Sequence, residues 1–434
     1  MLLQFLFILV AIIIGARIQG IGLGVMGGLG LAILVFGFGL EPTSPPIDVM
    51  LMIVAVIAAA GCMQAAGGLD LMVSMAEKLL RKHPQRITLL SPIVTYLFTF
   101  VAGTGHVAYS VLPVIAEVAR ETKIRPERPL SIAVIASQQA ITASPISAAT
   151  VALLSMLAGF DISLIHILAI TIPSTLVGVL LGAFFSMRMG KELHEDDEYL
   201  KRLEAGIFNE DKEERATTYK LKSRAGLSVL IFIMATILII LFGSIENLRE
   251  IKGIPLNMPI VIEILMLSAA ALILLLTKTN GIKAAQGSVF VAGMQAVVAI
   301  FGIAWMGDTF INGNMAELRT SIEGVVTSMP WIFGVALFVM SILLYSQAAT
   351  VRALMPLGIA LGISPWMLIA LFPTVNGYFF LPNYPTVVAA INFDRTGTTR
   401  IGKWVLNHSF MLPGLIATVG AVCTGILIIT IMGL

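Results

Sequence analysis

The sequence predicts an all-α polytopic membrane protein that is built from an inverted internal repeat. Three observations predict this fold. First, 58% of the 434 residues are hydrophobic and only 12% are charged, whereas an ordinary soluble domain carries about 25% charged residues. Second, the apolar residues fall in long runs, and a bilayer-spanning helix needs about 20 such residues. Third, two pairs of similar irregular segments recur in the same order along the chain.

The long apolar runs are the expected membrane spans. The first run precedes its first basic residue, Arg17, which is the reverse of a cleaved signal peptide, so we expect a retained span. Cys62 and Cys423 lie inside apolar runs and predict neither a disulfide framework nor a metal site. The net charge of +2 gives no indication of nucleic-acid binding, because the basic residues lie in loops. The clearest runs are residues 2–15, 21–40, 49–66, 164–187, 227–242, 258–276 and 404–432.

The basic residues orient these spans, because loops rich in Lys and Arg stay in the cytoplasm. Basic clusters at 78–86 and 120–128 predict that the 67–86 loop and the 120–128 loop are both cytoplasmic. The mostly apolar segment 87–118 between them is too short for two spans, which would need about 40 residues. We therefore expect a re-entrant hairpin over 87–118 that turns at the glycines of 102–106, since glycine readily adopts positive φ.

The remaining segments follow in order from this starting point. Residues 129–157 are expected to cross outward with a break near Ser144 and Pro145, and the basic linker 188–224 to lie in the cytoplasm. A second hairpin, 330–363, would enter from outside, and 365–391 would cross inward with a break between Pro382 and Pro385. The sequence thus divides into a first repeat (1–187), a linker (188–224) and a second repeat (225–434), with both termini periplasmic.

The two halves resemble each other in sequence. Residues 103–113 align with 346–356, and residues 143–147 align with 382–386, so a hairpin tip is followed by a broken helix twice. The expected topology gives the second copy the opposite orientation, and inverted repeats with interrupted helices are typical of secondary transporters. Prolines remove backbone donors and break the helix, and the freed groups and half-helix N-termini suit a small dianion. The sequence therefore predicts a transporter of a small organic dianion.

The expected substrate contacts lie at the hairpin tips and beside the proline breaks. Two structural alternatives stay open for them. Small tip residues can serve only to let helices approach closely, and polar residues beside prolines can serve only to satisfy a kink. The candidates are Gly103, Thr104, Gly105, Ser144, Pro145, Ser147, Ser346, Gln347, Thr350, Asn383, Pro385 and Thr386.

Three ionisable residues are further candidates. His106 adjoins the first tip and, with an ordinary pKa near 6.5, is either a proton sensor or a polar packing residue. Asp308 is either a coupling residue within the membrane or an interfacial carboxylate. Arg352 lies inside a hairpin limb, where its guanidinium could clamp a substrate carboxylate. Arg125 and Arg128 either set the topology or steer the substrate.

A series of motifs in this order resembles the anaerobic C4-dicarboxylate carrier (Dcu) family from end to end. In the first half these are Gly-Ala-Arg at 15–17, Gln64 with Gly-Gly-Leu-Asp at 67–70, Glu-Lys-Leu-Leu-Arg at 77–81, Gly-Thr-Gly at 103–105, Arg-Pro-Glu-Arg-Pro at 125–129 and residues 141–147. In the second half they are Ser-Gln-Ala-Ala at 346–349, Tyr-Pro at 384–385, residues 396–402 and Asn-His at 407–408.

This resemblance implies exchange of fumarate, succinate, malate and aspartate across the bacterial inner membrane, or uptake coupled to H⁺ or Na⁺. It also implies a homodimer of the elevator type, similar to the ion-transporter superfamily, that works without cofactor or metal. An intramembrane enzyme is disfavoured, because the chain shows no paired catalytic carboxylates at membrane depth and no His/Cys ligand spacing. A membrane sensor, an accessory subunit and a carrier of another small organic anion remain as alternatives.

Overall fold

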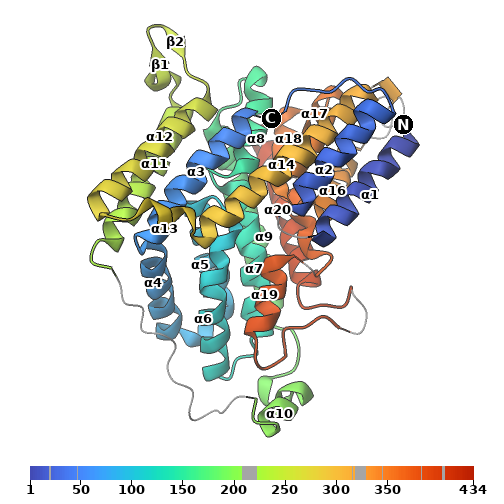
Figure 1. Ribbon diagram of the computed structural model, residues 1–434. Coiled ribbons are helices and arrows are strands. Elements are labelled where there is room, and N and C mark those ends of the chain that lie inside the picture. Colours follow the sequence, from blue (N-terminus) through green and yellow to red (C-terminus); the bar gives the residue numbers. More distant parts are fainter. Residues whose placement is uncertain are drawn as a thin grey trace.

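The computed structural model describes residues 1–18, 21–45, 47–207, 222–314, 316–317, 329–344, 346–382, 384–402 and 406–434. The described chain is almost entirely helical (Figure 1). Its one small sheet pairs β1 (Glu250–Ile251) antiparallel with β2 (Ile254–Pro255) between two long helices. The all-α prediction is therefore confirmed.

Seven helices of the described chain are long and apolar enough to cross a membrane, and the bent pair formed by α3 (Ile47–Ala65) and α4 (Gly68–Lys82) raises the number to eight. The protein is thus a multi-pass membrane protein, as its composition predicts. The seven are residues 84–102, 127–157, 164–186, 225–244, 258–277, 288–313 and 411–431.

The upper part of the molecule in Figure 1 contains the N-terminal helices and the first helices of the second half. Its members are α1 (Leu2–Ile18), α2 (Gly22–Ala32) with η1 (Ile33–Gly37), α3, α11 (Ala225–Ser244), α12 (Met258–Thr277), α13 (Gly281–Ala285) and α14 (Ser288–Gly313). Glycines bring α2 and α14 into direct backbone contact. A Cβ atom on Gly27 would lie 2.5 Å from the carbonyl carbon of Gly302, and a Cβ atom on Gly24 would collide with the carbonyl of Val298.

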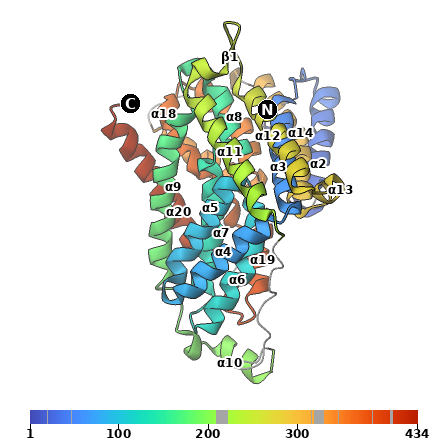
Figure 2. The same ribbon diagram turned by 90° about the vertical axis from the view of Figure 1, so that its left-hand side faces the viewer.

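The lower part contains α4, α5 (Ile87–Ala102), α6 (Ala108–Glu121), α7 (Glu127–Ala143) and α19 (Pro385–Phe393) (Figures 1 and 2). Residues 67–86 were expected to be a loop, and that expectation is wrong because 68–82 form α4. Leu69, Val73 and Leu80 recur at helical spacing and are buried on one face of this helix. The 68° bend between α3 and α4 is made at Gly67, whose φ of +86° favours glycine.

α5 and α6 form a pair of limbs joined at residues 103–107. α5 ends at Ala102, Gly103 takes a φ of +69°, and the short 3-10 turn η3 (Gly105–Val107) leads into α6. Arg81, just before α5, forms ion pairs with Glu121 (2.5 Å) and Glu117 (3.4 Å) near the end of α6. The outer ends of the two limbs therefore lie at the same end of the molecule.

α7 ends at Ala143 and continues, after a break, as α8 (Ala148–Leu157). At the break Ser144 is extended (φ −79°, ψ 128°). Ser147 Oγ satisfies a carbonyl freed at the break, that of Ile141 (2.5 Å), and Ser144 Oγ donates to the carbonyl of Phe100 (2.7 Å) in the last turn of α5. η4 (Ala158–Phe160) then leads into the long helix α9 (Leu164–Ser186).

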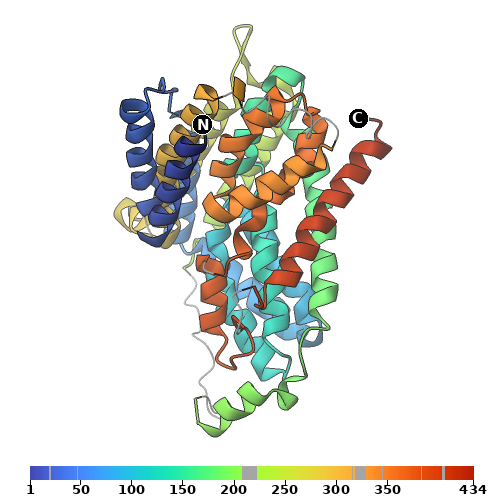
Figure 3. The same cartoon turned by 90° about the vertical axis from the view of Figure 1, so that its right-hand side faces the viewer.

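α16 (Trp331–Leu344) and α17 (Gln347–Ala360) form the second pair of limbs. A Cβ atom on Gly358, near the end of α17, would lie 2.7 Å from the ring of Phe333, near the start of α16, so these outer ends also meet. α18 (Pro365–Leu371) follows beside the start of α9, where the rings of His166 and Trp366 are 5.4 Å apart. The ends of the second pair therefore lie beside the start of α9, at the opposite end of the molecule from α10 (Asp197–Glu204) (Figures 1 and 3).

The irregular stretch in 365–391 begins earlier than the sequence indicates. α18 tightens into the 3-10 segment η7 (Phe372–Phe379), in which Asn376 leaves helical geometry (φ −98°, ψ 28°). α19 then starts at Pro385. The N–H of Gly377 is satisfied outside the segment, by Ser341 Oγ at 2.8 Å. The expected break at 382–385 is therefore the last part of a longer non-α segment.

The described part of the linker is attached to the protein at both ends. η5 (Leu193–Glu195) and α10 make the first part of the linker partly helical, and most residues between 190 and 201 are exposed, as expected of a solvated, partly helical connector. Leu193, Asp196 and Tyr199 are buried and attach it to the rest of the protein. At the other end, Lys222 and Arg224 each donate at 2.5 Å to a carbonyl in the last turns of α3 and α12, those of Ala65 and Leu276. Such cations are favourable at helix C-termini.

α20 (Met411–Ile431) packs antiparallel along α9 and ends at the face that also carries the N-terminus (Figure 3). Glycines again allow the close approach, since a Cβ atom on Gly182 would lie 3.1 Å from the carbonyl oxygen of Pro413. η2 (Pro84–Arg86) and η6 (Glu246–Arg249) complete the described elements.

Candidate functional site

Four side-chain amides gather where the second tip meets the irregular parts of both halves. Gln347 is the first residue of α17, and its Nε2 donates to Gln138 Oε1 of α7 (2.9 Å) and to Asn376 Oδ1 of η7 (3.3 Å). Asn376 Nδ2 in turn donates to Gln139 Oε1 (3.2 Å). We call Gln138, Gln139, Gln347 and Asn376 the amide cluster. All four are buried, and Gln347 is the most exposed at 7%.

The first tip lies against the same cluster. Gly105 is so close to Gln138 that a Cβ atom there would collide with the side-chain amide. Gly103 lies against the first break, because a Cβ atom on it would be 2.9 Å from the side chain of Ile146. Thr104, between them, is half-buried, whereas the side chain of His106 lies outside the described part of the structure. Both tips and both irregular segments therefore meet around the amides.

The second tip is held by capping hydrogen bonds. Ser346 is the N-cap of α17, and its Oγ accepts the N–H of Ala349 at 3.2 Å. Thr350 Oγ1 donates to the carbonyl of Ser346 at 2.8 Å. These two predicted contact residues shape the turn, and Gln347 between them is the tip residue that reaches the cluster.

The residues beside the prolines differ in how they are satisfied. The hydroxyl hydrogens of Ser144 and Ser147 are committed to backbone carbonyls, as in a satisfied kink. Thr386, in the first turn of α19 after Pro385, is completely buried and its Oγ1 has no hydrogen-bond partner. Asn383 lies outside the described residues.

Asp308 and Arg352 are neighbours across the α14–α17 contact. They interact electrostatically, and a Cβ atom on the adjacent Gly307 would lie 3.5 Å from the Cβ atom of Ala353. Arg352 Nε is buried without a hydrogen-bond partner. In the described part of the chain no hydrogen bond joins this pair to Gln347, so the amides and these two charges form separate groups.

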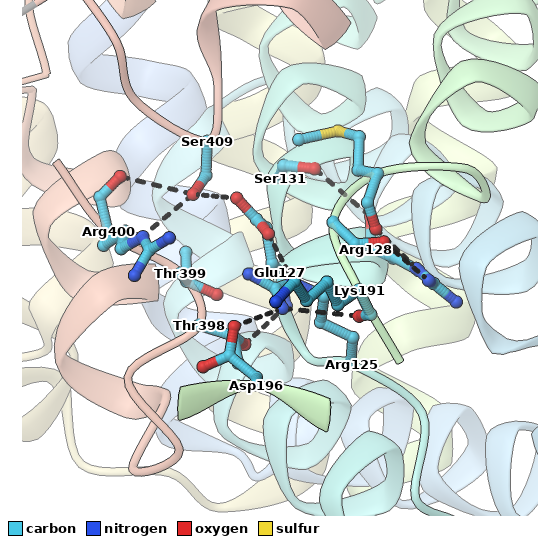
Figure 4. Close-up of polar contacts among 12 residues, drawn as sticks. Arg125, Glu127, Arg128, Ser131, Lys191, Asp196, Thr398, Thr399, Arg400 and Ser409 are labelled. Carbon is cyan, nitrogen blue, oxygen red and sulfur yellow. Dashed lines mark hydrogen bonds and ion pairs between the residues drawn. The ribbon is translucent and has the colours of Figure 1, made fainter. Parts of the chain in front are cut away.

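Arg125 lies in a buried ion cluster at the lower end of the molecule (Figure 4). Its side chain is 3% exposed and pairs with Glu127 (2.5 Å) and Asp196 (2.6 Å). Burial alone would lower the pKa of Arg125, but the two carboxylates outweigh that effect and raise it. Ser409 Oγ donates to the second oxygen of Glu127 at 2.6 Å. Arg125 is therefore fully engaged in structure, which argues against a role in steering substrate.

The amides of the cluster, other than Gln347, were missed by sequence inspection. Gln138 and Gln139 lie in the middle of an apolar, fully buried helix, and Asn376 lies in an equally apolar stretch. Polar side chains at such positions are expensive in a membrane and are usually functional. Amide side chains within apolar stretches are visible in the sequence and indicate such a site. Glycine and proline indicate only the residues beside the turns and breaks.

The site contains donors and acceptors for a polar ligand and no recognisable ligand set for a metal. Among the described residues, no three His, Cys, Asp or Glu side chains come together to hold an ion. The arrangement is suited to binding a small polar molecule by uncharged donors inside a membrane-spanning bundle.

Comparison with known proteins identifies the family of this chain. The profile of the anaerobic C4-dicarboxylate membrane transporter family (DcuA_DcuB) matches residues 1–433. The anaerobic C4-dicarboxylate transporter DcuB of Escherichia coli O157:H7 is 44% identical over 429 residues, 95% of each chain. The C4-dicarboxylate transporter DcuA of Escherichia coli strain K12 is 44% identical over 428 residues, 98% of each chain. DcuA of Wolinella succinogenes is 43% identical over 431 residues, 99% of each chain.

Proposed function

Because the chain belongs to the anaerobic C4-dicarboxylate membrane transporter family, we propose that it carries C4-dicarboxylates across the bacterial inner membrane. The substrates would be fumarate, succinate, malate and aspartate, moved by exchange or by uptake coupled to H⁺ or Na⁺. The relatives are named as transporters, and we propose that this chain has no enzymatic activity.

The observation that supports this function best is the amide cluster. It joins the second tip to α7 and η7, with the first tip packed on Gln138. Gln347 Nε2 donates to two amide oxygens, which are neutral acceptors. A carboxylate is a stronger acceptor, and a charge-assisted hydrogen bond is about twice as strong as a neutral one. A bound dicarboxylate would therefore displace the amide–amide bonds and separate the elements that they now join.

We further propose that both limb pairs are re-entrant and that the halves are inverted repeats. The outer ends of the first pair meet at the Arg81 ion pairs. The outer ends of the second pair lie beside the start of α9, at the face opposite to α10 (Figure 1). With the basic linker in the cytoplasm, both termini would be periplasmic. Alternating access would then expose the amides to each side in turn, and the protein would act as an elevator-type homodimer.

Asp308 is our candidate for coupling to an ion. It lies in α14, which packs against α17, the helix that begins with Gln347. A carboxylate that interacts with Arg352 across this contact would sense any shift of α17 against α14. This role is separate from substrate binding, and Asp308→Asn would change the dependence on an ion gradient while exchange continued.

Counterflow in liposomes tests the transport function directly. Purified protein is reconstituted with internal succinate, and uptake of labelled fumarate is measured against protein-free liposomes and against liposomes loaded with butyrate. We expect uptake only with internal succinate. Folded, correctly inserted protein that gives no uptake above the protein-free control would refute the assigned substrate class.

A further inference from the structure

Two hydroxyl groups near the start of α19 are buried and have no hydrogen-bond partner. Tyr378 is 2% exposed and Thr386 is fully buried, and neither hydroxyl oxygen is bonded. Most buried hydroxyls are satisfied, and an exception in a native structure calls for an explanation. Thr95 and Thr171, for comparison, donate to backbone carbonyls at 2.8 Å and 2.9 Å. The two unbonded hydroxyls carry a desolvation cost that a ligand would relieve.

Both residues are associated with the start of α19, Thr386 as part of its first turn and Tyr378 of η7 through a ring contact. Tyr384 is the N-cap of α19, and the ring of Tyr378 packs on its ring with centroids 4.5 Å apart. Thr386 follows in the first turn, after Pro385, which has no N–H. The N–H groups of a first helical turn have no partner within the helix and carry partial positive charge. The start of α19 therefore combines two unbonded hydroxyls with the positive end of a helix.

This helix end is close in the chain to the amide cluster. Tyr378 follows Asn376 by two residues in η7, so the backbone that presents an amide to Gln347 also presents the Tyr378 ring to α19. α19 packs in turn on α6 and on α7, the helix that carries Gln138. A four-carbon diacid has two anionic ends, and one group of donors is needed for each end.

We propose that Tyr378 and Thr386, together with the first-turn N–H groups of α19, bind one carboxylate of the dicarboxylate. This inference rests on the proposed function and adds to it the residues that recognise the second charge. O–H groups bonded to a carboxylate form short charge-assisted bonds. All of these donors are neutral, so no cationic side chain neutralises the carboxylate at this end of the site. A monocarboxylate with the same number of carbons leaves one donor group unfilled and is rejected.

The test uses two conservative substitutions and two matched controls. Tyr378→Phe and Thr386→Val remove only the unbonded hydroxyls. Tyr96→Phe removes a hydroxyl that is bonded to Thr175 at 2.8 Å, and Thr171→Val removes one that is bonded to the carbonyl of Ile167. Succinate and butyrate affinities are measured by calorimetry on purified full-length protein, together with the melting temperature of the ligand-free protein.

We expect Tyr378→Phe and Thr386→Val each to weaken succinate binding by about tenfold or more, while butyrate is rejected by these variants as it is by the wild type. Their ligand-free melting temperatures should stay at or above that of the wild type, because no internal bond is lost. The two controls should melt lower and keep their succinate affinity. Wild-type affinity for succinate in both hydroxyl variants would overturn the inference, as would ligand-free melting temperatures lowered as much as in the controls. Absence of succinate binding to the wild type would instead refute the proposed function itself.

Discussion

Replacing Arg125 by methionine is expected to destabilise the protein strongly, because it leaves two carboxylates buried without their cation. Arg125 is 3% exposed and contacts Glu127 and Asp196 at 2.5 Å and 2.6 Å. Removing one partner of a buried pair typically costs about 3–5 kcal/mol. The cost is mainly that of the uncompensated charges, since methionine fills much of the volume of the arginine stem.

Asp196→Asn measures the contribution of the ion pair to stability without that of the helix cap. Asp196 Oδ1 accepts the N–H groups of Glu198 and Tyr199 at 3.0 Å and 3.1 Å, and asparagine is an equally good N-cap. The variant therefore loses only the charge-assisted bond from Arg125, for which we expect about 1.5–3 kcal/mol. Glu192→Gln is the matched acid-to-amide control. Its carboxylate is 54% exposed beside Arg128, and its loss should cost less than about 1 kcal/mol.

Unfolding can be followed through Cys62, which is buried, in a Cys423→Ala background that removes the exposed thiol. A thiol-reactive dye then reports melting of the detergent-solubilised protein. The expected order of melting temperatures is Glu192→Gln near the wild type, Asp196→Asn clearly lower and Arg125→Met lowest. If Arg125→Met melted no lower than Glu192→Gln, the buried cluster would contribute nothing and the reasoning would be wrong.

The pH dependence of stability gives a second measure of the Arg125–Asp196 ion pair. Burial alone would raise the pKa of Asp196, but the hydrogen bond from Arg125 and those from backbone N–H groups lower it below its ordinary value. A carboxyl group with a lowered folded-state pKa stabilises the protein above its unfolded pKa, which is about 3.9, and this stabilisation is lost as the pH falls below that value. The difference in stability between the wild type and Asp196→Asn should therefore be constant from about pH 5 to 8 and shrink in stronger acid.

Three further predictions concern the tips and the second break. Gly105→Ala should reduce counterflow, because its Cβ atom would displace the Gln138 amide from the amide cluster, whereas Gly28→Ala, which meets open space, should transport normally. Gln347→Leu should reduce counterflow at least tenfold in correctly inserted protein, and near-normal uptake would exclude Gln347 from the site. Burial lowers the pKa of His408, so the wild type should lose stability as the pH falls below about 6.5. The melting temperature of His408→Gln should fall less over the same pH range.

The sequence was a good guide to features that depend on local chemistry. Long apolar runs predict spans whatever they pack against. Glycine at 103 and proline at 145 mark interruptions, because each acts on its own backbone, and the chain does turn at 103 and break at 144. Amphipathic α4 was taken for a loop because its Lys and Arg residues dominated the interpretation, although its buried stripe has clear helical spacing.

The site was harder to predict, because it depends on contacts between distant segments. Gln138 and Gln347 are hydrogen-bonded although 209 positions separate them, and no local pattern pairs them. Tyr378 reads as an ordinary buried aromatic until its hydroxyl is found without a partner. In the sequence Arg125 indicates only a cytoplasmic loop. Its ion pair with Asp196 forms because the linker folds back onto the start of α7.

The glycine seam between α2 and α14 restricts how this protein can move. Gly24, Gly27 and Gly302 bring the two backbones so close that even a methyl group would not fit. A shift by one residue along the seam would drive the side chains of neighbouring residues into the opposite backbone, so the two helices must travel together. At the α14–α17 contact a Cβ atom on Gly307 would fit, at an ordinary van der Waals distance of 3.5 Å from the Cβ atom of Ala353. If one part of the molecule moves relative to another to carry a substrate, the movement takes place at the α14–α17 contact. α2 and α14 then move together as one rigid unit.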